Sequence, residues 1–310
     1  MRWLDYLYLA VTPRSASFVQ GWGDQEQIGM ALDGSWSNIE AEPTSVCWTS
    51  SRTQGAVRIR DGKFDSSALD LPPESRIGRV RLVEPRYGAS RGIVVALPSW
   101  GDDDWSTRER IYTPAVQYGL SLLMLENPFY GSRRRVGQIG TGLCTVSDFV
   151  LMGRAIMRET LSLLGWAREQ GYPVMGIAGY SMGGQLAALT ASLSPDPLRI
   201  ALVAPSALPH TVFVDGPLKA DIAWDCLGPD GPPRLRQIMG ALSVLSLPPP
   251  RESSSAVLLG TRRDAFVQPG DVGAIARHWG THTRWLDDGH ISVITLRARA
   301  VAQAVVDAFA

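Results

Sequence analysis

A serine between glycines is the residue of this sequence whose setting most strongly suggests chemistry. Ser181 lies within Gly179-Tyr180-Ser181-Met182-Gly183, a G-x-S-x-G pattern that follows an apolar run and precedes a stretch with helical periodicity. A serine on a sharp turn between a strand and a helix exposes its hydroxyl, and only glycine tolerates the close neighbouring backbone there. The pattern therefore predicts a nucleophilic serine. The competing interpretation is a glycine-rich turn that merely contains serine.

A nucleophilic serine needs a base, and histidine is the usual one. The four histidines are His210, His278, His282 and His290. Where this turn carries a nucleophile, the partners follow in the order serine, acid, histidine, and the histidine comes after the last strand. His290 has that position and is the predicted base. His210 is expected to be solvated or packed. His278 and His282 are four residues apart, but Gly280 interrupts a helix there, so we expect no metal site.

The acid that orients the base is predicted to be Asp264, which follows the apolar run before the last strand. Its carboxylate would hold the imidazole in one tautomer and stabilise its protonated form. Asp215, downstream of an earlier strand, is the rival. Asp287 and Asp288 are too close to His290 in the chain to reach its ring, and we expect them to face water.

The developing negative charge of an acyl transfer needs two backbone donors. One is predicted to be the N–H of Met182, directly after the nucleophile. The other should come from the loop after Ile93–Leu97, where the N–H of Trp100 is our first choice and that of Gly101 the second. Tyr180 and Gly101 are expected to contact substrate. The competing interpretation of this loop is a plain acidic turn.

Two weaker patterns are expected to carry no chemistry. The run Gly131–Arg135 follows a strand and offers charge to an anionic substrate group, but such runs are usually solvated loops. The segment Gly140–Gly142 is a lone G-x-G without the strand or the Lys-Ser/Thr of a phosphate-binding loop, so we expect no nucleotide.

The elements that must position these residues are short apolar runs alternating with longer amphipathic stretches. Continuous apolar runs are typical of strands covered on both faces, and the alternation predicts an α/β fold with a mostly parallel central sheet and helices on both faces. The expected strands are Val80–Val83, Ile93–Leu97, Leu120–Leu125, Val174–Gly179, Ile200–Ala204, Ala256–Gly260 and Thr283–Leu286. The expected helices include Asp148–Arg168, the stretch from Met182 to Leu193 and the tail from Ile294 to Ala308.

Residues 1–310 are expected to form a single domain. Residues 206–250 are rich in Pro and Gly, separate two core strands and are expected to form a lid. Residues 1–75 are expected to be an N-terminal extension with a hairpin that turns at Asp61-Gly62. The expected strands of this hairpin are Gly55–Arg60 and Lys63–Ser66.

The composition sets the broad class. With 30 basic and 30 acidic residues the net charge is zero, so we expect no nucleic-acid partner. The three cysteines form no disulfide framework, and the first apolar run is too short to span a bilayer and is interrupted by Asp5, so a cytoplasmic location without a stable membrane span is expected. No cofactor is implied, and the sequence does not indicate an oligomeric state.

Several motifs together resemble the α/β-hydrolase domain-containing protein 18 family, in particular its bacterial-type members. These motifs are Gly21-Trp22-Gly23, Asp61–Phe64, Glu126–Gly131, Val146-Ser147-Asp148 with Met152-Gly153, Ser181–Gly184, Asp264-Ala265-Phe266 and Asp288–Ser292. The resemblance covers most of the chain. It implies the α/β-hydrolase fold, the triad of Ser181, Asp264 and His290, and hydrolysis of carboxylic esters, of lipid or other acyl type.

The chain departs from this family in two places. The family has a Thr-Gly-Asp-His run where this chain has Trp100–Asp103, which bears on the oxyanion contact. The long insertion of eukaryotic members before the last strands is absent, so their mitochondrial address is not carried over. The expected partner is a small-molecule acyl ester. Two alternatives stay open: acyl transfer or other non-hydrolytic chemistry on the same site, and a ligand-binding protein that has lost turnover.

Overall fold

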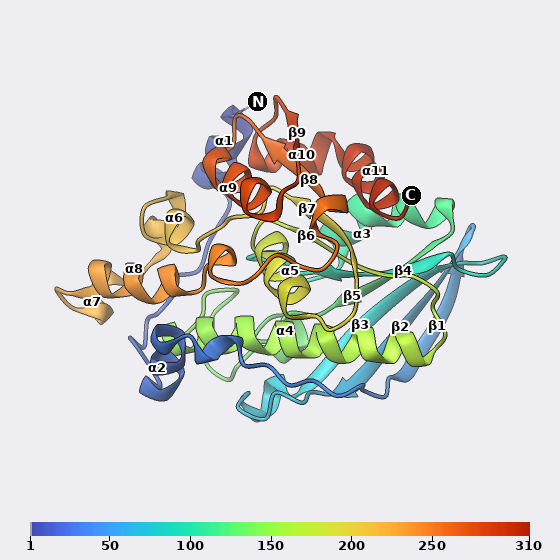
Figure 1. Cartoon of the computed structure of the whole chain (residues 1–310). Helices are drawn as coiled ribbons and strands as arrows, with labels where there is room; N and C mark the ends of the chain where they lie inside the picture. Colours follow the sequence, from blue (N-terminus) through green and yellow to red (C-terminus); the bar gives the residue numbers. More distant parts are fainter. Residues whose placement is uncertain (1) are drawn as a thin grey trace.

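The computed structural model describes residues 2–310 and places one large mixed sheet at the centre of the molecule (Figure 1). In these residues the sheet has nine strands in the order β1-β2-β3-β5-β4-β6-β7-β8-β9. The first three strands pair antiparallel, and β3 also pairs antiparallel with β5. From β5 to β9 all neighbours are parallel. This is the predicted α/β-hydrolase architecture.

All seven strands expected from the apolar runs are confirmed. β4 shows why they were visible, because every one of its residues is buried. Ile93, Val95 and Leu97 pack into a core on one face of the sheet, whereas Val94 and Ala96 pack into a core on the other. The strands are β1 (Cys47–Gln54), β2 (Val57–Asp65), β3 (Ile77–Pro85), β4 (Gly92–Leu97), β5 (Leu120–Leu125), β6 (Met175–Tyr180), β7 (Arg199–Val203), β8 (Val257–Thr261) and β9 (Thr283–Leu286).

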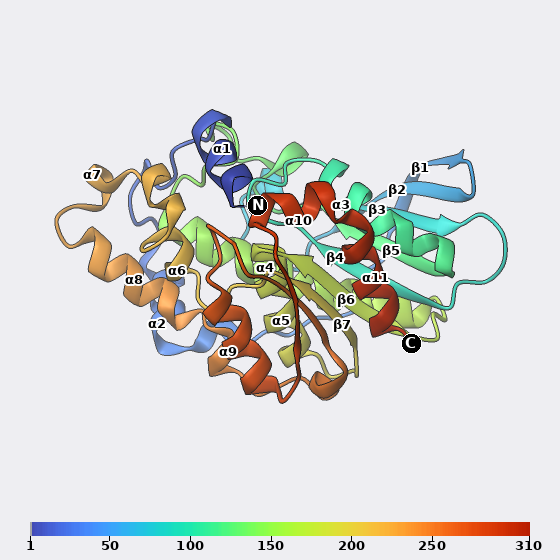
Figure 2. The same ribbon diagram turned by 90° about the horizontal axis from the view of Figure 1, so that it is seen from above.

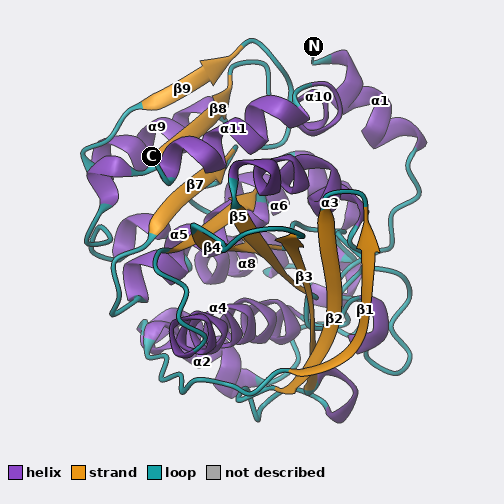
Figure 3. Cartoon of the chain, turned by 90° about the vertical axis from the view of Figure 1, so that its right-hand side faces the viewer, coloured by secondary structure: helices purple, strands orange, loops and turns teal. Residues whose placement is uncertain are grey.

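Helices cover both faces of the sheet, as Figures 2 and 3 show. α2, α4, α5, α8 and α9 contribute to one core, and α3, α10 and α11 contribute to the other. The α-helices are α1 (Trp3–Val11), α2 (Gln25–Asp33), α3 (Ser106–Tyr112), α4 (Val146–Glu169), α5 (Met182–Leu193), α6 (His210–Phe213), α7 (Trp224–Leu227), α8 (Gly231–Ala241), α9 (Pro269–Trp279), α10 (His290–Leu296) and α11 (Ala298–Ala308). No helix among residues 2–310 combines the length and apolar character needed to cross a bilayer.

The predicted hairpin turn at Asp61-Gly62 is wrong. Both residues lie in the middle of β2, and the chain turns at Gly55, whose φ is +57°. Gly62 pairs with Trp48 on β1, and a side chain at position 62 would lie 2.9 Å from the indole ring. The glycine therefore makes room for a cross-strand aromatic ring. The apolar pattern of the sequence did not predict β1 because its residues are mostly polar and exposed.

The expected tail helix is interrupted. α10 ends at Leu296 and α11 begins at Ala298, with Arg297 outside helical geometry between them. The expectation that Asp288 faces water is wrong, because this residue is buried and its carboxylate accepts a hydrogen bond from Arg297 Nε at 3.0 Å. Asp287 is exposed and lies 3.7 Å from Arg262 Nε.

The expected solvated loop at Gly131–Arg135 is also wrong in part. Arg133 is fully buried and forms an ion pair with Glu159 of α4, which is equally buried. Its guanidinium also donates to the carbonyl oxygens of Ser75 and Glu126. This arginine therefore fixes the loop to α4 and does not face a substrate.

Residues 206–250 run between β7 and β8 and fold as short helices, of which α6, α7 and α8 are the α-helical ones (Figure 1). Leu235, Ile238 and Met239 of α8 are buried in the same core as α2 and α5. That this segment acts as a lid, and that the chain is a single domain, stay predictions.

Candidate active site

The turn at Ser181 has the backbone conformation that the G-x-S-x-G pattern predicts. Ser181 lies between β6 and α5 with φ +57° and ψ −125°, a region that side-chain-bearing residues rarely adopt. Its N–H donates to the carbonyl of Val203 on the neighbouring strand at 2.9 Å. A side chain at Gly179 would collide with the backbone of Gly183, and a side chain at Gly183 would lie 2.7 Å from the Leu97 carbonyl oxygen, so both positions require glycine. The backbone of Ser181 is therefore strained, and its hydrogen bond to Val203 and the flanking glycines stabilise this conformation.

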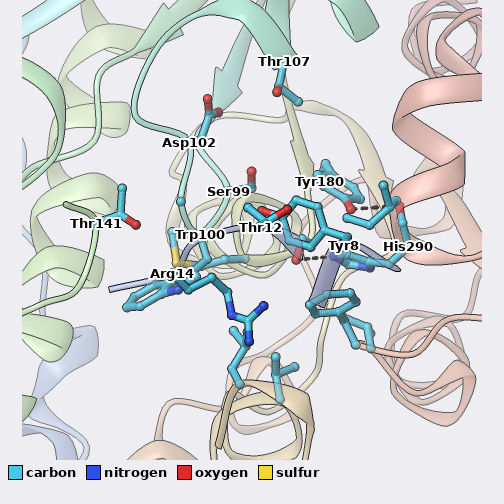
Figure 4. A pocket seen from close by; sticks show the side chains of 18 of the residues that line it. Tyr8, Thr12, Arg14, Ser99, Trp100, Asp102, Thr107, Thr141, Tyr180 and His290 are labelled. Atoms are coloured by element: carbon cyan, nitrogen blue, oxygen red, sulfur yellow. Dashed lines mark hydrogen bonds between the residues drawn. The ribbon is translucent and has the colours of Figure 1, made fainter. Parts of the chain in front are cut away.

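The three side chains predicted to form a triad converge at the carboxyl ends of the parallel strands. Ser181 Oγ lies 2.9 Å from His290 Nε2, and His290 Nδ1 lies 2.8 Å from Asp264 Oδ2. Figure 4 shows His290 beside Tyr180 at one wall of a cavity. Asp264 follows β8 and His290 follows β9, two strands that pair in parallel. The sheet therefore brings the acid and the base to one edge.

Asp264 is buried but well supplied with donors. Oδ1 accepts from the N–H groups of Phe266 and Val267, each at 2.8 Å, and Oδ2 accepts from the Thr261 hydroxyl at 2.6 Å. Burial alone would raise the pKa of Asp264, but the charge of His290 and these hydrogen bonds outweigh it and hold that pKa below its ordinary value. The group is a carboxylate ready to orient an imidazole.

Two aromatic rings flank the imidazole of His290. The ring centroids of Tyr180 and Phe266 lie 4.7 and 4.8 Å from it. Tyr180 lines the cavity with its ring, but its hydroxyl donates to the carbonyl oxygen of His290 at 2.9 Å. Burial, together with the nearby carboxylate charges, raises the pKa of Tyr180 well above its ordinary value, so the hydroxyl stays a donor. That Tyr180 contacts substrate stays a prediction.

The rival acid Asp215 and the histidine His278 bond to groups other than Ser181 and His290. Asp215 pairs with His210 Nδ1 at 3.0 Å and with Arg236, and it makes no bond to His290. His278 Nε2 lies 2.8 Å from the carbonyl oxygen of Leu247. Within residues 2–310 no three His, Cys, Asp or Glu side chains gather closely enough to hold a metal ion.

The two predicted oxyanion donors both line the cavity beside Ser181. The N–H groups of Met182 and Trp100 have no acceptor within residues 2–310. The N–H of Gly101, the second choice, donates to the Tyr130 hydroxyl at 3.4 Å. This contact favours Trp100 over Gly101 as the donor.

The loop that carries Trp100 is fixed by a buried ion pair. Asp102 Oδ2 lies 2.7 Å from Arg108 Nε, and both side chains are almost fully buried. The Arg108 guanidinium also donates to the carbonyl oxygen of Leu125 at the end of β5. The loop after β4 is therefore joined to the sheet, which limits how far the Trp100 amide can move.

A cavity of about 520 Å³ opens at Ser181 (Figure 4). Part of its wall is aromatic and aliphatic, with Trp100 packed edge-on against Phe213 at 4.8 Å between ring centroids. Val212, Phe213 and Leu218 come from residues 206–250. Tyr8 and Thr12 reach the cavity from the N-terminal segment. Other parts of the wall are polar, and Arg14 and Asp221 are charged.

Comparison with known proteins gives the family. The family model described as alpha/beta hydrolase domain containing 18 matches residues 15–232 and 230–310. The chain belongs to this family. The solved structures add a likeness in fold.

Three solved structures illustrate the likeness in fold. Acetyl xylan esterase 1 from a Thermoanaerobacterium species is 15% identical, with 95% of this chain and 97% of that chain covered and a TM-score of 0.60. An acetyl xylan esterase from a Paenibacillus species is 14% identical, with 95% and 98% covered and a TM-score of 0.59. An S-formylglutathione hydrolase from Agrobacterium tumefaciens is 13% identical, with 83% and 99% covered and a TM-score of 0.53.

In this alpha/beta hydrolase domain containing 18 family member, three side chains to which the sequence assigned no role contact the predicted triad or the backbone beside it. Thr261 donates to Asp264, Phe266 packs beside His290, and Asp5 accepts hydrogen bonds from the backbone next to both. Thr261 and Phe266 lie within three residues of the predicted acid, so proximity in sequence was a usable signal. Asp5 gave only a weak signal, a carboxylate inside an apolar run.

Proposed function

We propose that this protein is a serine hydrolase of carboxylic esters, with Ser181 as nucleophile, His290 as base and Asp264 as the acid that orients the base. The observation that carries the proposal is the unbroken pair of hydrogen bonds from Ser181 Oγ through the imidazole to Asp264, at 2.9 and 2.8 Å. A second support is the strained φ of +57° at the serine, which is typical of a nucleophile turn.

The reaction follows from these positions. His290 Nε2 takes the proton of Ser181 Oγ as Oγ bonds to the acyl carbon, and the carbonyl electron pair moves to oxygen, where the N–H groups of Met182 and Trp100 donate to it. The intermediate collapses, the C–O bond to the alcohol breaks, and His290 returns its proton to the alcohol. Water then repeats the sequence on the acyl-enzyme and releases the acid. Asp264 stays ionised throughout.

The acyl group of the substrate is proposed to be apolar, as in lipid-type esters. Trp100, Phe213 and Phe266 form an apolar wall beside Ser181, and the cavity of about 520 Å³ has room for more than an acetyl group. Transfer of such a chain out of water is favourable by about 0.8 kcal/mol for each buried CH₂. The likeness in fold to esterases is consistent with this chemistry but does not define the acyl group.

A panel of p-nitrophenyl esters with increasing acyl length, run beside a phospholipid, tests the proposal. We expect turnover in water that rises with acyl length, and loss of turnover in the Ser181→Ala variant. An acyl-enzyme seen by mass spectrometry that only an added alcohol or amine discharges would instead establish acyl transfer. A folded protein with neither turnover nor acyl-enzyme would establish a ligand-binding protein.

A further inference from the structure

The most deeply buried side chain of the N-terminal helix α1 is a charged one. Of its nine residues only Asp5 is fully buried, with an exposed fraction of 0%. Trp3, Leu7 and Val11 are exposed to 61%, 47% and 64%. Amphipathic helices normally bury the apolar side and expose the charge. The buried carboxylate of α1 therefore needs hydrogen-bond donors from the rest of the protein.

The partners of Asp5 are three backbone amides. Oδ2 accepts from the N–H of Ala265 and from the N–H of His290, each at 2.9 Å, and Oδ1 accepts from the N–H of Ile291 at 2.8 Å. No ion pair joins Asp5 to a Lys, Arg or His side chain within the described part of the chain. The charge is therefore met by the amides alone, an arrangement that makes hydrogen bonds short and directional.

These amides belong to the loop that carries the acid and to the start of α10, which carries the base. Ala265 directly follows Asp264, and Ile291 directly follows His290. Because one oxygen atom bonds to both the Ala265 and the His290 nitrogen, the two backbones are held at a fixed separation. α1 packs against α10, the helix that begins with His290, and Tyr8 of α1 contacts Phe266 in the loop of the acid (Figure 2).

The chain around the base is shaped to admit this carboxylate. Gly289 precedes His290, and a side chain at position 289 would lie 2.7 Å from Asp5 Oδ2. That distance is too short for a carbon–oxygen contact, so only glycine allows the close approach. Glycine before the base and aspartate on α1 thus form one complementary contact.

We infer that Asp5 is a positioning residue, which sets the distance between Asp264 and His290 by binding the amide directly after Asp264 and the amide of His290. The inference rests on the proposed function, because it gives Asp5 its role through the triad. Asp5 does not touch the reacting atoms. Asp5 is 260 residues from Ala265 and 285 residues from His290 in the sequence, and its carboxylate links the two backbone segments.

Steady-state kinetics of Asp5→Asn and Asp5→Ala test the inference, with Leu7→Ala as the control on the exposed face of the same helix. Misplacement of a triad member by about 1 Å can lower the rate about 100-fold. We therefore expect kcat to fall about 10- to 100-fold in Asp5→Ala with little change in KM, a smaller fall in Asp5→Asn because one acceptor oxygen remains, and no change in Leu7→Ala.

A proton NMR spectrum of the resting protein gives a readout that needs no turnover. The low-field proton of the His290–Asp264 hydrogen bond should shift or broaden in Asp5→Ala and stay unchanged in Leu7→Ala. A lower Tm with unchanged kcat and an unchanged low-field proton would mean that Asp5 only anchors α1, and would overturn the inference. A wild-type protein without turnover but with that proton lost in Asp5→Ala would overturn the proposed function alone.

Discussion

The hydroxyl of Tyr180 donates to the main-chain carbonyl of His290 at 2.9 Å. Tyr180 is the last residue of β6 and directly precedes Ser181, the proposed nucleophile, so this bond joins the end of β6 to the start of α10, where the proposed base lies. The serine and the imidazole are therefore held together by a contact that does not involve the reacting atoms. Asp5 makes the corresponding contact between the base and the acid. The geometry of the site depends on backbone contacts as much as on the three side chains.

Replacement of the acid should separate the two candidate aspartates. We expect Asp264→Asn to lower kcat about 10⁴-fold, because the amide favours the wrong imidazole tautomer. Asp215→Asn should change kcat by less than about twofold, as for a surface substitution, because Asp215 bonds to His210 and Arg236 instead. Ester hydrolysis rates of the two purified variants decide between them. A large loss confined to Asp215→Asn would contradict the assignment.

Trp100 is expected to act through its backbone on the oxyanion and through its ring on the acyl chain. Trp100→Ala keeps the N–H and removes the ring that packs against Phe213. We expect kcat toward a short acyl ester to stay within about threefold. KM toward a long acyl ester should rise about 10-fold, because the lost contact is equivalent to the burial of about one to two methylene groups. A kcat that falls about 100-fold for every ester would mean that the ring itself serves the chemistry.

Arg133 and Glu159 should be coupled in stability and have no role in substrate binding. Both are fully buried, so Glu159→Gln or Arg133→Met alone leaves one buried charge without its partner. We expect either change to cost about 3–5 kcal/mol in the free energy of unfolding. The double variant Arg133→Met, Glu159→Gln should cost clearly less than the sum of the two single variants. Chemical denaturation of the three variants measures this, and additive costs would show that the pair is not coupled.

Asp61 gives a prediction for pH. Burial alone would raise the pKa of Asp61, but hydrogen bonds and charge from Arg81, with further bonds from Ser50 and Arg52, outweigh it and lower the pKa below 3.8. A carboxyl group whose pKa is lowered by folding stabilises the fold above its ordinary pKa, and this contribution is lost as the pH falls through the folded value.

Urea unfolding of the wild type and Asp61→Asn should therefore differ by about 0.5–1 kcal/mol near neutral pH. The difference should shrink toward zero once the pH falls below 3.8, the ordinary value for this carboxyl. Asp65→Asn at the exposed end of the same strand is the control and should leave stability nearly unchanged. A difference that grows with acid would mean that protonated Asp61 is the stabilising form.

Strands of the parallel half such as β4 were predictable from the sequence because they are buried on both faces and read as continuous apolar runs. The sequence did not predict β1, whose exposed polar residues carry no such signal. The Asp61-Gly62 pair has the chemistry of a turn, but Gly62 is required by the ring of Trp48 across the strand. Tertiary packing there overrides local turn preference.

The site shows the same difference between local sequence signals and contacts that form only in the folded chain. The positions of Ser181, Asp264 and His290 follow from chain order and strand ends, which are local signals. Asp5 is different, because its partners lie at the other end of the chain and are backbone amides, which any residue type can supply. Composition and spacing cannot reveal such a contact.

The most direct test of the central claim is covalent labelling with a fluorophosphonate, followed by intact mass measurement and peptide mapping. Our account predicts one phosphonyl adduct per chain, on the Ser181 hydroxyl, with no adduct in Ser181→Ala and much slower labelling in His290→Ala. A correctly folded wild-type protein that forms no adduct, or an adduct that persists in Ser181→Ala, would contradict the account.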